Sequence, residues 1–223
     1  MLIIRLEKVS GQGSRYITSM LPVRNVFCGC WKSWSWTTKL TAISAMIKTR
    51  LAPPELNDIH PLGKSPLVTD DDTRIHESGA ITDYLIRKYG NGKLAPAADS
   101  ADYVKYMEWI HYAEGSAMLP LLLHLYTRRL GDGAAPLRPR IDSETNNHFC
   151  FVNNEMKGKE YFVGDSLSGA GIMMSFQLEI AKARGVLAVF QPLSDFVDRI
   201  QARPAYLRAL KRGGDEATAM FGR

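Results

Sequence analysis

The chain has 223 residues, of which 45% are hydrophobic and 23% charged, the composition of an ordinary globular protein with one large or two small domains. No run of about 18 apolar residues occurs, and Met1 to Leu6 is too short for the core of a signal peptide, so we expect a cytoplasmic protein with no membrane partner. The net charge of +5 comes from dispersed basic residues, so we expect no nucleic-acid partner. Three cysteines do not make a disulfide framework.

Residues 13–48 have an unusual local composition. The stretch from Cys28 to Trp36 holds three of the four tryptophans and two of the three cysteines, with no stable hydrophobic period. An insertion, a metal or redox site, and an error of reading frame would each produce such a segment. A lone Cys28-x-Cys30 pair lacks the two further ligands of a structural zinc, and no predicted neighbour activates a thiol. We therefore expect no metal.

Residues 60–76 predict a tight turn followed by two short strands. The turn ends in the X-Pro step Ser65-Pro66, where a cis bond costs only about 0.5 to 1 kcal/mol. A cis bond there would leave the backbone of Ser65 free to pair with an extended peptide. The alternation of Thr73 to His76 predicts the second strand.

Glu77 and Ser78 stand where this alternation gives way to apolar residues at helical spacing. A strand therefore leads directly into a helix N-terminus, whose unpaired backbone N–H groups and partial positive charge suit a carboxylate. Glu77 suits an ammonium group beside it. Together, the helix N-terminus and Glu77 would suit the α-carboxylate and the ammonium group of an α-amino acid. Alternatively, Glu77 and Ser78 form only an ordinary helix start.

After a boundary near residue 92, the sequence predicts only helices. One or two helices are expected over Asp102 to Leu130, where Pro120 interrupts the apolar face, and residues 131–139 are expected to form a loop. A weaker helix covers residues 142–157, because its asparagines have low helix propensity. Three more are expected over residues 171–184, 193–202 and 204–211.

Residues 49–223 resemble the glutathione S-transferases of the bacterial and fungal type. The family's G-K-x-P turn with its cis-proline corresponds to Gly63-Lys64-Ser65-Pro66, and its E-S-x-A-I helix start to Glu77-Ser78-Gly79-Ala80-Ile81. The resemblance implies a thioredoxin-like α/β domain over residues 1–92 with an atypical first βαβ unit. It also implies an all-α domain for substrate binding and dimerisation over residues 93–223.

The resemblance also implies ligands and site residues. Glutathione would be the co-substrate, held by Lys64, Ser65, Pro66, Glu77 and Ser78. A small apolar electrophile would face Tyr106, Trp109, His111 and Tyr112, although a lone histidine on an apolar helix also suits a packing role. The partner would be a second copy in a homodimer. One departure is Gly171, which replaces the acid of a capping box begun by Ser168, a loss of about 0.5 to 2 kcal/mol.

Residues 13–48 depart from the family as if they were translated out of frame. Read from the third base of each codon, Leu21 to Lys48 can encode a loop serine, an amphipathic helix and a strand, which are the elements that the family carries here. The chain as written then has no residue that matches the family's catalytic hydroxyl or thiol. Tyr16 lacks the surrounding motif, so the catalytic residue is unknown.

Three functions follow. The first is a detoxifying transferase that conjugates the glutathione thiolate to small apolar electrophiles. The second is a catalytically inactive relative that at most binds ligands. The third is an interaction module without a small-molecule ligand, which would form dimers but neither bind glutathione nor turn it over.

Overall fold

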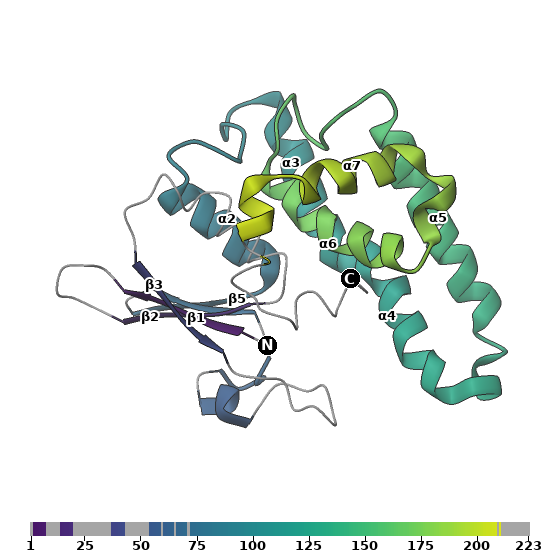
Figure 1. Ribbon diagram of the computed structural model, residues 1–223, viewed down its shortest axis with the longest axis horizontal. Helices are drawn as coiled ribbons and strands as arrows, with labels where there is room; N and C mark the ends of the chain where they lie inside the picture. The colour runs from purple at the N-terminus through teal and green to yellow at the C-terminus, as the bar shows by residue number, and fades with distance from the viewer. Residues whose placement is uncertain are drawn as a thin grey trace. The chain divides into compact units, whose positions relative to one another are not determined.

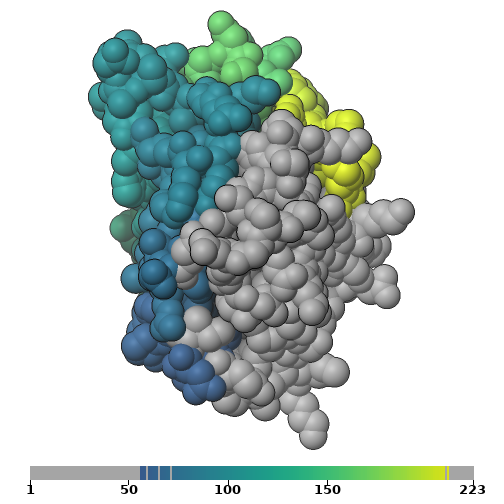
Figure 2. Space-filling model, turned by 90° about the vertical axis from the view of Figure 1, so that its left-hand side faces the viewer, coloured from purple at the N-terminus to yellow at the C-terminus, as the bar shows by residue number. Residues whose placement is uncertain are grey.

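The computed structural model describes the backbone of three strands before residue 50, and residues 54–58, 60–64, 66–70, 72–208 and 210. The residues whose side chains are placed are coloured in Figure 2. The chain divides after Asn91 into two compact units, and the segment that starts at Pro204 groups with the first. Each unit is described by itself.

The first unit contains a five-stranded sheet of order β3-β1-β2-β4-β5 (Figure 1). Its strands are β1 (Leu2–Glu7), β2 (Ser14–Ser19), β3 (Thr37–Ala42), β4 (Leu67–Asp70) and β5 (Thr73–His76). Every neighbouring pair is antiparallel. A βαβ unit joins parallel strands, so the described strands before residue 50 do not form one.

The hairpin of β4 and β5 leads into the helix α2 (Ser78–Tyr89). Leu67 and Val68 of β4 are buried, and so are Ile81, Leu85 and Ile86 of α2. These apolar residues follow the period of a helix with one buried face, and Figure 1 shows α2 lying against the sheet. A short 3-10 helix, η2 (Pro54–Asp58), precedes the hairpin.

The second unit is built around α6 (Gly169–Ala183), in which twelve of fifteen residues are buried. This helix contacts the segments α3 (Ala101–Tyr112), η3 (Ala113–Ala117), η5 (Val186–Val189) and α7 (Gln191–Gln201). The remaining elements are α4 (Met118–Thr127), η4 (Arg128–Ala134) and α5 (Arg138–Met156). The apolar side chains of α6 therefore form the core of this unit.

Two predicted helix boundaries need correction. The first long helix is interrupted by the π-helical segment η3, so Pro120 falls in the first turn of α4, where a missing N–H is tolerated. The predicted weak helix begins at Arg138 instead of residue 142, with Pro139 in its first turn. Its buried residues recur on one face, and this packing outweighs the low propensity of the asparagines (Ile141, Thr145, Phe149, Val152 and Met156).

The helices of the described residues are all too short or too polar to cross a membrane.

Candidate functional site

The register of the β4–β5 hairpin brings the two predicted glutathione motifs together. Leu67 pairs with His76, so Pro66, which precedes β4, and Glu77, which follows β5, stand at the same end of the hairpin. Lys64 and Glu77 are exposed, and Pro66 and Ser78 are half-buried. Ser65 lies outside the described residues, and the predicted cis bond at Ser65-Pro66 depends on it.

Glu77 holds a strained backbone conformation. Its φ of 71° and ψ of 122° lie in a region that residues other than glycine rarely adopt, at a cost of about 1 to 3 kcal/mol. The conformation reverses the chain, so that α2 starts immediately after the strand. Sequence periodicity places this junction but carries no signal of its dihedral angles.

The N-terminus of α2 has no cap from the side chain of Glu77. The Glu77 carbonyl accepts the first hydrogen bond of the helix from the N–H of Ile81, at 2.9 Å. The backbone N–H groups of Ser78, Gly79 and Ala80 precede that bond, and the side chain of Glu77 does not cap them. The first turn of α2 contains no acidic residue. A carboxylate placed there would meet unpaired donors and the positive end of the helix dipole.

A tight turn precedes the X-Pro step. Gly63 has a φ of +54°, a left-handed conformation that favours glycine. The N–H of Gly63 donates to the carbonyl of His60 at 2.8 Å. The ring of His60 lies 4.5 Å from that of His76, measured between centroids. This contact joins the turn to the end of β5, and sequence reasoning missed both histidines because only the fold brings them together.

Of the four residues predicted to face an electrophile, two have accessible side chains. Tyr106 and Trp109 are 0% and 2% exposed, and the Trp109 ring lies 4.8 Å from that of Phe162. His111 is exposed and Tyr112 is half-buried. Access therefore favours His111 and Tyr112 for contact with a ligand.

Tyr112 is also paired with a residue that the sequence did not indicate. Its hydroxyl lies 2.6 Å from Nδ1 of His148 on α5. Burial raises the pKa of Tyr112 to about 12, so the phenol is protonated at neutral pH. The tautomer of His148 decides which of the two groups donates the hydrogen bond. This places a polar pair at the edge of the aromatic cluster around Trp109.

The catalytic residue stays unassigned. The side chains of Tyr16, Cys28 and Cys30 lie outside the described residues. Within the part of the chain whose side chains are placed, no three His, Cys, Asp or Glu side chains gather in a possible metal site.

Comparisons with known proteins give one family for both units. Residues 39–93 match the family model "Glutathione S-transferase, N-terminal domain", and residues 116–204 match "Glutathione S-transferase, C-terminal domain". Glutathione S-transferase 1 of Saccharomyces cerevisiae is 31% identical over 180 residues, covering 70% of this chain and 76% of the relative. Glutathione S-transferase 3 of Schizosaccharomyces pombe is 28% identical over 186 residues, covering 76% of each.

Solved structures give the same fold. A glutathione S-transferase from Actinobacillus pleuropneumoniae has a TM-score of 0.74 and 26% identity over 86% of each chain. A glutathione transferase from Phanerochaete chrysosporium, solved with oxidized glutathione, has a TM-score of 0.73 and 19% identity over 91% of each chain. These likenesses confirm the predicted fold class, a thioredoxin-like α/β domain followed by an all-α domain.

Proposed function

Because the chain belongs to the glutathione S-transferase family, we propose that it binds glutathione at the end of the β4–β5 hairpin and transfers its thiolate to small apolar electrophiles. The observation that supports this most is the pairing of Leu67 with His76, which sets Pro66 beside Glu77 and the N-terminus of α2, where Glu77 makes no side-chain cap. The two halves of a tripeptide site would otherwise lie apart.

Each group of glutathione has a matching partner at this end of the hairpin. The carboxylate of the γ-glutamyl residue would accept hydrogen bonds from the first turn of α2, and its ammonium group would pair with Glu77. Pro66 and the backbone of Ser65 would align the peptide, and the exposed Lys64 would attract the glycine carboxylate. The strain at Glu77 supports a binding role, since strained residues concentrate at functional sites.

The chemistry would rest on the glutathione thiolate, because the thiolate is the nucleophile. The electrophile would approach His111 and Tyr112, the two accessible residues of the predicted pocket. The second candidate function is binding without turnover. It is favoured by the sequence of residues 13–48, where the family carries its sulfur-activating hydroxyl or thiol and where this chain has no residue that matches it.

We test the proposal with isothermal titration of glutathione and with conjugation of a chromogenic aryl halide. Binding with turnover supports the transferase, and binding without turnover supports the inactive relative. Glu77→Gln should weaken binding about tenfold, because it removes the charge that pairs with the ammonium group. Asp165→Asn, an exposed acid of the helical unit, is the matched control. No binding by the wild-type chain contradicts both candidates.

The proposal extends to assembly and location. The family implies a homodimer in the cytoplasm, with residues 1–92 holding glutathione and residues 93–223 providing the electrophile pocket and the dimer contacts. Light scattering coupled to size-exclusion chromatography tests the dimer, and a monomeric mass across the working concentration range contradicts it.

A further inference from the structure

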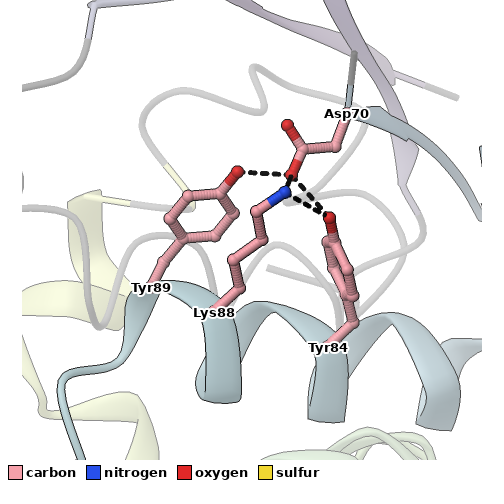
Figure 3. A network of polar contacts seen from close by, with 4 residues as sticks. All are labelled: Asp70, Tyr84, Lys88 and Tyr89. Carbon is pink, nitrogen blue, oxygen red and sulfur yellow. Dashed lines mark hydrogen bonds and ion pairs between the residues drawn. The ribbon is translucent and has the colours of Figure 1, made fainter. Parts of the chain in front are cut away.

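Asp70, the last residue of β4, carries a carboxylate that is 1% exposed, and three side chains of one helix meet its Oδ2 atom (Figure 3). The hydroxyl of Tyr84 donates to Oδ2 at 2.8 Å, and Nζ of Lys88 lies 2.9 Å from the same oxygen. Tyr89 donates to Oδ2 as well. Three side chains of α2 thus converge on one buried oxygen atom.

The hydrogen bonds run in one direction, from Lys88 through Tyr84 to Asp70. Nζ of Lys88 donates to the hydroxyl of Tyr84 at 2.7 Å, and Tyr84 in turn donates to Asp70. Hydrogen bonds to Tyr84 and Asp70 raise the pKa of Lys88, and burial raises the pKa of Tyr84. Both groups therefore keep their protons at neutral pH and act as donors. A buried carboxylate is tolerable only when such donors replace its water.

The position of this network in the hairpin gives it a possible role beyond stability. Pro66 and Glu77 stand at one end of the hairpin, and Asp70, which pairs with Thr73, stands at the other. The helix α2 starts at the first end and runs back toward the second. Tyr84 is six residues after Ser78, a rise of about 9 Å along α2. Asp70 is three residues after Leu67, a rise of about 10 Å along β4. Tyr84 and Asp70 therefore lie at similar distances from the end of the hairpin where α2 starts.

The helix is therefore fixed to the hairpin at both ends. At its start the covalent chain passes through the strained Glu77, and in its second half three side chains hold Asp70. The buried apolar face of α2 also holds the helix, but apolar packing depends mainly on volume and shape and fixes its direction less closely. A tilt about Glu77 would turn the N–H groups of Ser78 to Ala80 away from a bound carboxylate. A ligand site needs such support, because small errors in geometry weaken binding.

We infer that Asp70 is a positioning residue for the ligand's carboxylate, acting through Tyr84, Lys88 and Tyr89 on the direction of α2. This rests on the proposed function, since it concerns the same end of the hairpin. Asp70 does not touch the ligand in this account.

The test compares two ligands by isothermal titration. One is glutathione; the other is 4-aminobutyryl-cysteinyl-glycine, in which hydrogen replaces the α-carboxylate of the γ-glutamyl residue. For Asp70→Asn we expect binding of glutathione to weaken about tenfold while binding of the analogue is unchanged, because only glutathione uses the N-terminus of α2. Asp198→Asn is the matched control, since it removes an exposed carboxylate that pairs with Lys182 at 2.7 Å in the helical unit.

A merely structural role predicts a different result. If Asp70→Asn weakens both ligands by the same factor, or weakens neither, the inference is overturned while the proposed function stands. If the wild-type chain binds neither ligand, the proposed function itself fails. Tyr84→Phe serves where Asp70→Asn does not fold, because it removes one donor and leaves Lys88 and Tyr89 on Asp70. It should lower the preference for glutathione over the analogue by a smaller factor, and an unchanged preference contradicts the inference.

Discussion

The hairpin–helix segment Leu67–Tyr89 and the helical unit are stabilised in different ways. In the first, three donors of α2 converge on the buried carboxylate of Asp70. In the second, α6 buries twelve of its fifteen residues, and rings such as Phe162 and Phe196 pack 5.0 Å apart. Hydrogen bonds depend on direction, whereas apolar packing depends mainly on volume and shape. The first arrangement suits a segment that must orient a ligand, and the second suits a core.

The largest expected effect is on the apolar core. Phe196→Ala should lower the free energy of unfolding of the helical unit by about 3 to 5 kcal/mol, because Phe196 is 0% exposed and its loss leaves a cavity. Chemical denaturation measures the change. The control is Val189→Ala, at a side chain that is 80% exposed, with an expected change within about 0.5 kcal/mol. Equal losses in the two variants would mean that Phe196 is not part of a tight core.

A substitution at Glu77 should separate stability from binding. Glycine adopts a φ of 71° without strain, so Glu77→Gly should raise the free energy of unfolding by about 1 kcal/mol after its own entropy cost. The same variant should bind glutathione about tenfold more weakly, because the partner of the ammonium group is lost. Thermal unfolding and titration measure the two effects. A variant that is less stable than the wild type would argue against strain at this residue.

Gln177 makes a buried hydrogen bond in the helical unit that can be compared with the hydrogen bonds to Asp70. It is 0% exposed, and its Nε2 donates to the carbonyl of Ala113 at 2.9 Å. That carbonyl also accepts from the N–H of Met118, the hydrogen bond that spans the π-helical segment. Gln177→Leu should cost about 1 kcal/mol of unfolding free energy, the value of one hydrogen bond.

The matched control for this variant is Gln191→Leu, since Gln191 is exposed and donates to Asp195 at 2.6 Å. Its expected effect is below about 0.5 kcal/mol. If Gln177→Leu leaves the free energy of unfolding unchanged, the hydrogen bond from Gln177 to Ala113 does not stabilise the helical unit. The helical unit would then differ more clearly from the hairpin–helix segment, where hydrogen bonds meet at Asp70.

The last expected effect is a dependence on alkaline pH. Folded Tyr112 keeps its proton up to a pKa of about 12, whereas a tyrosine in the unfolded chain has a pKa of about 10, so the unfolded state releases the proton first. The free energy of unfolding should therefore fall as the pH rises from 10 toward 12. Tyr112→Phe should reduce this fall, and Tyr126→Phe, at a 63% exposed tyrosine, should not. Identical pH dependence in both variants would contradict a buried, protonated Tyr112.

The sequence predicted the parts of the molecule that depend on short-range pattern. The alternation of Thr73 to His76 and the helical spacing after Ser78 located β5 and α2, because both patterns are periodic. The start of α5 was missed because residues 131–139 were predicted as a loop, whereas Pro139 fits the first turn of a helix.

Features that depend on tertiary structure could not be read from the sequence. The contact of His60 with His76 and the convergence of α2 on Asp70 require the hairpin register and the direction of the helix. The positive φ of Glu77 has no sequence signal, because glutamate does not favour it. Glu77 lies at the candidate site, where local preference commonly yields to function.

Amide hydrogen exchange tests most directly the proposal that the N-terminus of α2 holds the carboxylate of glutathione. Gly79 and Ala80 are in the first turn of α2, whose N–H groups have no partner within the helix. We predict that glutathione slows exchange of these two amides and that the analogue without the α-carboxylate does not. Unchanged exchange at Gly79 and Ala80 while glutathione is bound would contradict the account.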